Sequence, residues 1–121
     1  MPISYAIDPK QRLVTTRAWG VVTEDEVREH NQTLRVDPAF DPSYRQLADM
    51  VAVTESRVGP KWINQASADN FFDPGARRAF VASTDANFGM SRKFALQAEA
   101  HGQTIQVFRD MASAKKWLGL D

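Results

Sequence analysis

The chain alternates between short stretches in which every second residue is apolar and longer stretches in which apolar residues recur every three or four positions. The first pattern is typical of a half-buried strand, and the second is typical of a helix that covers a core. We predict strands over 3–8, 12–22, 45–53, 78–83 and 104–108, and helices over 24–36, 60–72, 86–101 and 111–118. The resulting order, β-β-α-β-α-β-α-β-α, predicts an α/β fold in which a mixed β-sheet has an N-terminal antiparallel hairpin and right-handed crossovers.

Each predicted helix begins at a recognisable signal. Thr23 and Glu26 form a capping box, in which the threonine hydroxyl and the glutamate carboxylate each meet a free backbone N–H group. Pro60 suits the first helical position, because the N–H group that proline lacks would have no partner there. Asp85 and Asp110 are placed to cap the third and fourth helices.

Composition places the chain among ordinary globular proteins. Its 121 residues make about one average domain, which we predict to span 1–121. Hydrophobic residues make up 43% and charged residues 25%, which excludes a disordered tail and a coiled-coil rod. The 15 basic and 15 acidic side chains cancel, so we expect no basic surface of the kind that nucleic-acid binding needs.

The chain contains no cysteine, which excludes disulfides, thiolate metal sites and a cysteine nucleophile. It has no apolar run close to the roughly 18 residues of a membrane span, and its first residues lack the pattern of a signal peptide. We therefore expect a cytoplasmic protein without a membrane span.

Residues that could carry chemistry are few. His30 and His101 are the only histidines, they fall on different predicted helices, and neither has a partner at metal-ligand spacing, so we interpret both as structural. The Gly-x-Ser-x-Gly, Ser-x-x-Lys and Gly-x-Gly-x-x-Gly motifs are absent. We predict no catalytic residue, no cofactor, no metal and no enzyme activity. The pairs Arg77–Arg78 and Lys115–Lys116 are interpreted as solvated surface.

One polar segment is a candidate interaction site. Asp49 lies in the C-terminal half of an inner strand, the end at which open α/β sheets bind ligands, although capping a loop is the commoner role of such an aspartate. Thr54, Ser56 and Arg57 are expected in a turn that leads to a helix N-terminus, where free N–H groups favour an anion. The four residues form a candidate interaction or anion-binding loop, and an ordinary helix start is the alternative.

Aromatic residues are numerous for a chain of this size, with seven phenylalanines, three tryptophans and two tyrosines. Most of them fall at positions that a core would take. Trp62 and Leu96 fall away from the apolar stripes of their helices, which predicts a partner surface. Apolar surface of this kind favours a homodimer, another protein partner or a small apolar ligand.

Several segments carry a resemblance to a known family. They are Leu47–Thr54, Pro74–Ala82, Phe88–Arg92, Val107–Asp110 and Trp117–Leu118, and together they span nearly the whole chain. In these segments the chain resembles the SpoIIAA-like superfamily, which contains the STAS domains and a group of small, uncharacterised bacterial STAS-like proteins. The resemblance implies a mixed sheet of four or five strands with helices, and it implies an activity only weakly.

In the anti-sigma-factor antagonists of this superfamily, a partner kinase phosphorylates a serine shortly after an Asp-Leu-x-x-Val-Thr run. Here Asp49, Val53 and Thr54 match the run, but Val58 stands at the place of the serine and Ser56 comes two residues early. The resemblance therefore implies a non-enzymatic regulatory or protein-interaction domain of the STAS-like type without the phosphorylatable serine. The alternative is a binder or carrier of a small apolar, lipid-like ligand, because the superfamily resembles the lipid-transfer CRAL-TRIO domains.

Overall fold

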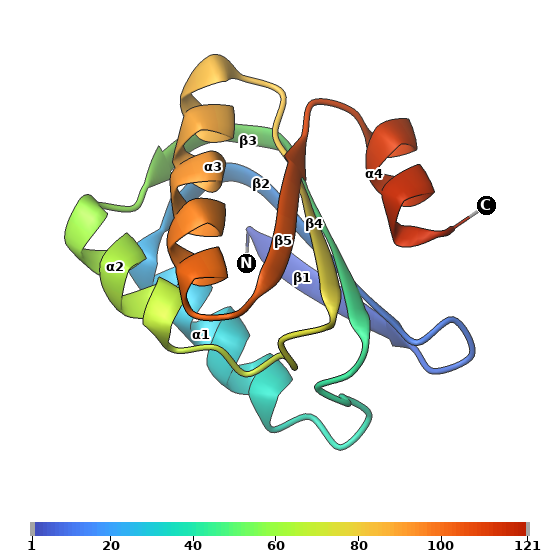
Figure 1. Ribbon diagram of the computed structural model, residues 1–121. Helices are drawn as coiled ribbons and strands as arrows, with labels where there is room; N and C mark the ends of the chain where they lie inside the picture. The colour runs from blue at the N-terminus through green and yellow to red at the C-terminus, as the bar shows by residue number, and fades with distance from the viewer. Residues whose placement is uncertain (1, 121) are drawn as a thin grey trace.

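The computed structural model describes residues 2–120 and contains strands and helices in the predicted order. The strands are β1 (Ile3–Asp8), β2 (Leu13–Thr23), β3 (Arg45–Arg57), β4 (Arg77–Val81) and β5 (Thr104–Phe108). The helices are α1 (Glu24–Arg35), α2 (Pro60–Ala68), α3 (Asp85–Ala100) and α4 (Met111–Leu118). Figure 1 shows them arranged as a sheet with helices on both sides.

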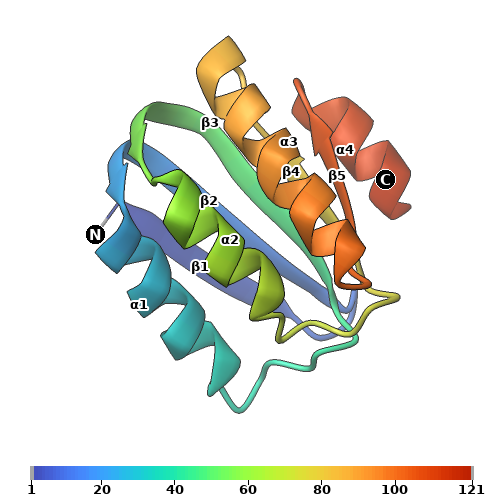
Figure 2. The same cartoon turned by 60° about the vertical axis from the view of Figure 1, so that its left-hand side comes forward.

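The five strands form one sheet in the order β1-β2-β3-β4-β5. β1 and β2 pair antiparallel and the later pairs are parallel, so the predicted hairpin and mixed sheet are confirmed. The crossovers through α1, α2 and α3 each advance by one strand in the same direction. Crossovers of one hand that advance in this way place their helices on one face, here called the three-helix face. Figure 2 shows these helices in front of the sheet, with α4 on the opposite face, here called the α4 face.

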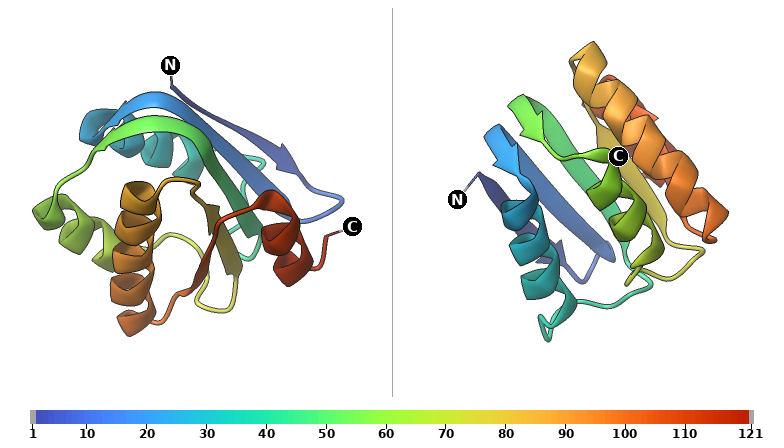
Figure 3. Two further views of the ribbon diagram at one scale, coloured as in Figure 1. Left: turned by 90° about the horizontal axis from the view of Figure 1, so that it is seen from above. Right: turned by 90° about the vertical axis from the view of Figure 1, so that its left-hand side faces the viewer.

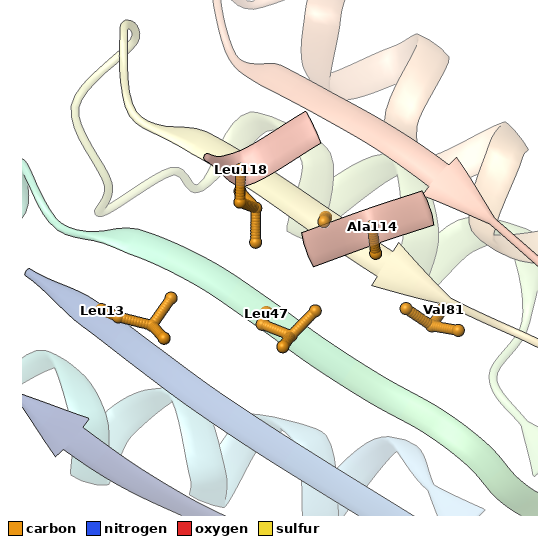
Figure 4. Close-up of a cluster of buried hydrophobic side chains, with 6 residues drawn as sticks. Leu13, Leu47, Val81, Ala114 and Leu118 are labelled. Carbon is orange, nitrogen blue, oxygen red and sulfur yellow. The ribbon is translucent and has the colours of Figure 1, made fainter. Parts of the chain in front are cut away.

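The α4 face carries a small apolar core beneath the last helix. Leu13, Leu47 and Val81 project from β2, β3 and β4 toward Ala114 and Leu118 of α4, as Figure 4 shows. All five side chains are buried, so the helix is fixed to the sheet by the apolar surface that they remove from water. This core holds α4 over β3, β4 and β5.

The three-helix face carries most of the core, in three clusters of buried side chains. They are centred on Val14 and Leu34 under α1, on Val22 and Val53 where β2 and β3 end, and on Ala98 and Ile105 under α3. Helices α1 and α3 are thereby held at the two edges of the sheet. The space between them is covered by α2, which packs mainly against α3.

β2 and β3 are longer than their neighbours and curve. The register between them shifts twice, between Arg17 and Trp19 and between Gly20 and Val21. Gly20 has a φ of 65°, a left-handed conformation that glycine adopts without steric cost. Such bulges bend and twist a pair of strands. Figure 3 shows β2 and β3 arching over the side of the sheet on which α2 and α3 lie.

The structure corrects the predicted end of the third strand. β3 continues to Arg57, whereas the sequence predicted its end at Val53 and a turn from Thr54 onward. The reason is that β2 extends beside β3 to its end: Val22 pairs with Ser56 and Thr23 with Arg57. The backbone groups of this segment therefore meet the ladder of a neighbouring strand and have no need of a turn.

The structure also corrects the predicted end of the second helix. α2 ends at Ala68 rather than near Phe72. Phe71 and Phe72 leave the helix and pack edge-on against Phe40, with ring centroids 5.7 and 5.1 Å away. Because edge-on aromatic pairs add to the burial of the rings, tertiary packing overrides the helical pattern here.

The signals at the helix starts are confirmed with one correction. The backbone N–H of Thr23 donates to Glu26 at 2.9 Å, which completes the capping box of α1, and the carboxylate of Asp110 caps α4. The cap of α3 is Thr84 in place of Asp85. Thr84 still has an extended backbone and accepts from the first turn, whereas Asp85 is already helical and cannot occupy the capping position.

Candidate functional site

A cavity of about 170 Å³ lies between the three-helix face of the sheet and helices α1, α2 and α3. The curved strands β2 and β3 supply one wall, which includes Ala18, Ala48 and Val53. α2 supplies Ile63 and Ala66 from the other side. Since α2 rests mainly on α3, the curve of the strands leaves room between this helix and the sheet. The cavity is the candidate functional site.

Most of the cavity wall is apolar. Beside aliphatic groups it includes the thioethers of Met50 and Met90 and the aromatic rings of Trp62, Phe80 and Phe94. Phe80 and Phe94 stack with ring centroids 5.7 Å apart, which joins β4 to α3 at the side of the cavity. A wall of this kind favours an apolar ligand, because water finds few hydrogen-bond partners against it.

A row of hydrogen-bonded polar side chains, here called the polar row, crosses the sheet beside the cavity. Arg78 of β4 donates from Nε to Oε1 of Gln46 at 3.0 Å and from Nη1 to Oε1 of Gln103 at 3.2 Å. Gln46 of β3 donates from Nε2 to Oγ1 of Thr16 on β2 at 3.1 Å. Gln103 donates to the carbonyl of Phe72 at 3.0 Å. All four polar side chains are buried, so these bonds replace the water that each would otherwise need.

The polar row continues to His30 of α1. Nε2 of His30 lies 3.4 Å from Oγ1 of Thr16, and Nδ1 lies 3.1 Å from Oδ1 of Asn31. The amide oxygen of Asn31 can only accept, so the ring proton belongs on Nδ1 and Nε2 accepts from the Thr16 hydroxyl. Burial lowers the pKa of His30, which keeps the ring neutral in this arrangement.

Arg78 brings a positive charge to the cavity. Its side chain lines the cavity, and the residue is only 7% exposed. Burial lowers the pKa of the guanidinium to about 9, so Arg78 still carries its charge at neutral pH. The guanidinium lies 4.3 Å from the ring centroid of Phe72 and 5.6 Å from that of Phe80. These cation–π contacts offset part of the cost of burying the charge.

The polar loop predicted before α2 does not exist in the structure. Thr54, Ser56 and Arg57 lie within β3, and only a two-residue connection separates that strand from α2. Thr54 and Arg57 are exposed, and Arg57 pairs with Glu55. Ser56 faces the cavity, where its hydroxyl lies 3.4 Å from Sδ of Met90. The register shift between Val53 and Glu55 breaks the alternation of the strand, so Thr54 is exposed while Ser56 faces the cavity, and the three residues form no common anion site.

Asp49 lies on the α4 face of β3, away from the cavity. It is two residues beyond Leu47, which packs under α4, and residues two apart in a strand share a face. Its Oδ1 accepts from the backbone N–H of Val51 at 3.1 Å. The sequence suggested that the carboxylate of Asp49 caps a loop. The carboxylate does accept a local backbone hydrogen bond, but that bond lies within the strand. The structure therefore separates Asp49 from Ser56, with which it was grouped.

The two residues predicted to form a partner surface lie in different surroundings. Leu96 of α3 is 60% exposed, as its position away from the apolar stripe predicts. Trp62 of α2 is half-buried and lines the cavity. The curve of β3 brings the sheet opposite Trp62, so this ring belongs to the cavity wall.

Arg78 was predicted to be solvated surface, and the structure places it in the interior. In β4 the pair divides between the two faces: Arg78 is buried beside the cavity, whereas Arg77 is exposed and donates to the carbonyl of Trp117 at 2.8 Å. The alternation of the strand contains this signal, since it places Arg78 on the same face as Phe80. Gln46 was not predicted either, because a lone amide in a strand matches no functional motif.

Within residues 2–120, no three His, Asp or Glu side chains are grouped so that they could hold a metal ion. Each helix in that range is too short or too polar to reach across a bilayer.

Comparison with known proteins identifies the fold. No family model matches the chain, and no curated protein matches it. A crystal structure does match: an uncharacterised protein of the DUF3478 family with a SpoIIAA-like fold, from Shewanella loihica PV-4. The match covers 96% of this chain and 93% of that one, with a TM-score of 0.60 and 17% sequence identity. This chain has a SpoIIAA-like fold.

The SpoIIAA-like fold agrees with the α/β class and the element order expected from the sequence. At 17% identity the likeness concerns the fold alone. The cavity and the polar row of this chain are therefore interpreted from its own residues.

Proposed function

We propose that this chain is a non-enzymatic binding protein that holds a small, mostly apolar molecule in the cavity between the sheet and α1, α2 and α3. The observation that carries the proposal is the cavity itself, with a volume of about 170 Å³ and mainly apolar walls. Transfer of an apolar molecule from water into such a space is favourable, because it removes apolar surface from water on both partners.

The volume of the cavity limits the ligand. In another protein, an engineered cavity of about 150 Å³ with Leu, Ile and Phe walls stays dry and takes up benzene. The cavity described here is of similar volume, about 170 Å³. We infer a ligand of about six to ten non-hydrogen atoms, such as a single ring or a short aliphatic chain. A long lipid chain exceeds this volume.

The polar groups around the cavity support binding rather than catalysis. A catalytic base or nucleophile needs a free lone pair or hydroxyl directed at its substrate. The polar atoms of Thr16, Gln46 and His30 are instead bonded to one another. Asn87 is likewise engaged, because its Nδ2 donates to the carbonyl of Val53 at 3.2 Å. These groups hold the cavity wall in place.

The proposal is tested by NMR titration of the protein with toluene. We expect saturable chemical-shift changes at backbone amides around the cavity, among them those of Val53 and Ala66. The variant Ala48→Ile fills the cavity from the sheet side, and we expect it to weaken toluene binding by about tenfold or more. Ala52→Ile is the matched control, because it makes the same change at an exposed position of the same strand and should leave binding unchanged.

Two outcomes would contradict the proposal. If toluene binds Ala48→Ile as tightly as it binds the wild-type protein, its binding site lies outside the cavity. The absence of any saturable change means that the cavity does not accept an apolar molecule.

A second candidate function is regulation through protein interaction. On the α4 face, the helix lies over β3, β4 and β5, and within residues 2–120 no helix covers β1 or the far ends of β2 and β3, as the left view of Figure 3 shows. Val51 of β3 is 42% exposed there, and the guanidinium of Arg17 lies 5.3 Å from the ring centroid of Trp19. Apolar surface of this kind favours a protein partner, and we propose a second copy of this chain as that partner.

This second candidate is tested by sedimentation equilibrium. We expect a dimer that Val51→Lys dissociates, because the substitution places a charge on the bare strand face. Val36→Lys is the matched control, since Val36 is 77% exposed at the end of α1. A protein that stays monomeric at high concentration would argue against self-association.

A further inference from the structure

The polar row leaves one group without a partner, the Nη2 end of Arg78. A guanidinium has five N–H donors, and the bonds to Gln46 and Gln103 use two of them. Within residues 2–120 no protein group accepts from Nη2, yet this nitrogen is not sealed off by protein atoms. Arg78 lines the cavity, and we take that space to be the one to which its free donors are directed.

The charge of Arg78 is also unpaired. Among the described residues that line the cavity, Asp69 is the single carboxylate. Asp69 pairs with Arg35 at 3.0 Å, and its side chain is 70% exposed, so it points to solvent rather than to Arg78. An unpaired charge in apolar surroundings is costly, and an anion that enters the cavity would relieve that cost.

We infer that the ligand is a small monocarboxylic acid whose carboxylate docks on Arg78 and whose apolar body fills the cavity. This inference rests on the proposed function, because it names the ligand class of the same cavity. The carboxylate accepts from Nη2 and from the free N–H of Nη1, and hydrogen bonds between ionised partners are the stronger kind. The body lies against apolar side chains such as Met50 and Ile63.

The charge and volume of the site select the headgroup. A single guanidinium balances a single negative charge, so a monoanion leaves the buried site neutral. A phosphate monoester carries nearly two charges at neutral pH and would leave an excess of negative charge among apolar walls. It would also take up volume that the apolar body needs.

The experiment compares acids with their neutral amides of equal size, using calorimetry on the wild-type protein at pH 7. The pairs are benzoate with benzamide and hexanoate with hexanamide, so that the two pairs also separate an aromatic body from an aliphatic one. We expect at least one acid to bind about tenfold or more tightly than its amide, as the loss of a charge-assisted hydrogen bond predicts.

Two variants assign the preference to Arg78. Arg78→Met keeps the length of the side chain and removes its charge, and we expect it to abolish the preference for the acid. Arg77→Met is the matched control, because Arg77 is the exposed neighbour on the opposite face of β4 and should keep the preference. If Arg78→Met does not fold, the comparison of acid and amide on the wild-type protein still decides whether the site prefers a carboxylate.

The outcomes separate this inference from the proposed function. Equal affinity for acid and amide, or binding of toluene without binding of either acid, overturns the carboxylate ligand and leaves the apolar cavity as proposed. A preference that survives in Arg78→Met overturns the role of Arg78. Failure of every probe, toluene included, overturns the proposed function as well.

Discussion

Nε of Arg78 donates to Oε1 of Gln46 at 3.0 Å, across the boundary between β4 and β3. The bond makes two buried polar side chains depend on each other, and Gln46 extends the dependence to Thr16 of β2. Each hydrogen bond between neighbouring members of the polar row pairs a donor with an acceptor, and the N–H groups left over include those at the Nη end of Arg78. A buried network joined in this way favours one arrangement of its strands, because any slip would break the bonds between its members.

Replacement of Gln46 by leucine should destabilise the protein. Gln46→Leu leaves the Nε–H of Arg78 without an acceptor and removes the donor to Thr16, and we expect a loss of about 3 kcal/mol in the free energy of unfolding. Chemical denaturation measures this loss. Gln106→Leu makes the same change at an exposed position of β5 and should alter stability by about 0.5 kcal/mol or less. Equal effects of the two variants would show that the polar row contributes nothing to stability.

Protonation of His30 should make stability depend on pH. Burial lowers the pKa of His30 below its ordinary value of 6.5. Below pH 6.5, His30 is therefore protonated in the unfolded chain while it is still neutral in the folded protein. The unfolded state then binds more protons, and stability falls as pH drops from 6.5 toward the lower pKa of the folded protein. The slope is at most about 1.4 kcal/mol per pH unit.

Two histidine variants isolate this effect. Denaturation curves between about pH 5 and 6.5 cover the window in which His30 titrates in the unfolded chain while most carboxylates stay ionised. His30→Gln should flatten the slope there. His101→Gln should leave it unchanged, because His101 is exposed at the end of α3. A slope that persists in His30→Gln would trace the pH dependence to other groups.

The order of elements could be predicted because each boundary signal acts locally. The capping box of Thr23 and Glu26 and the cap at Asp110 need only neighbouring residues, so they are legible in the sequence. The end of β3 could not be predicted in this way. Its last residues continue as a strand because β2 extends beside them to Thr23, and that pairing is a long-range contact.

The candidate site was harder to predict than the fold. Arg78 and Gln46 carry no motif, and their burial follows from which face of the sheet the helices cover. Conversely, Thr54 and Arg57 look like a polar loop, because nothing in their local sequence reveals the partner strand. The cavity is lined by residues such as Ala18 and Val53, which lie next to the register shifts of β2 and β3, and those shifts are a property of the strand pair.

The bulge makes Gly20 sensitive to substitution. At a φ of 65°, an added Cβ strains the backbone, although it would meet no atom within 4 Å, and we expect Gly20→Ala to cost about 1 kcal/mol in stability. Gly89→Ala is the matched control in α3, where the added methyl also meets nothing and alanine is the better helix former, so that stability should rise by about 1 kcal/mol. Thermal denaturation of the two variants should therefore shift in opposite directions, and a stabilising Gly20→Ala would refute the strain.

The cavity predicts an unusual response to a larger side chain in the middle of the sheet. Ala48 is buried in the central strand and lines the cavity, so Ala48→Ile adds apolar atoms to empty space rather than to a filled core. We expect a gain of about 1 kcal/mol in the free energy of unfolding, the usual effect of filling a cavity. In a close-packed core the same change forces neighbours apart and costs about 1–3 kcal/mol. Ala79→Ile provides that comparison, because Ala79 is fully buried in the core under α4, away from the cavity. Chemical denaturation measures the change in the free energy of unfolding for each variant. Changes of opposite sign would show that the space beside β3 is open to a ligand. A loss of stability in both variants would mean that this space closes in solution.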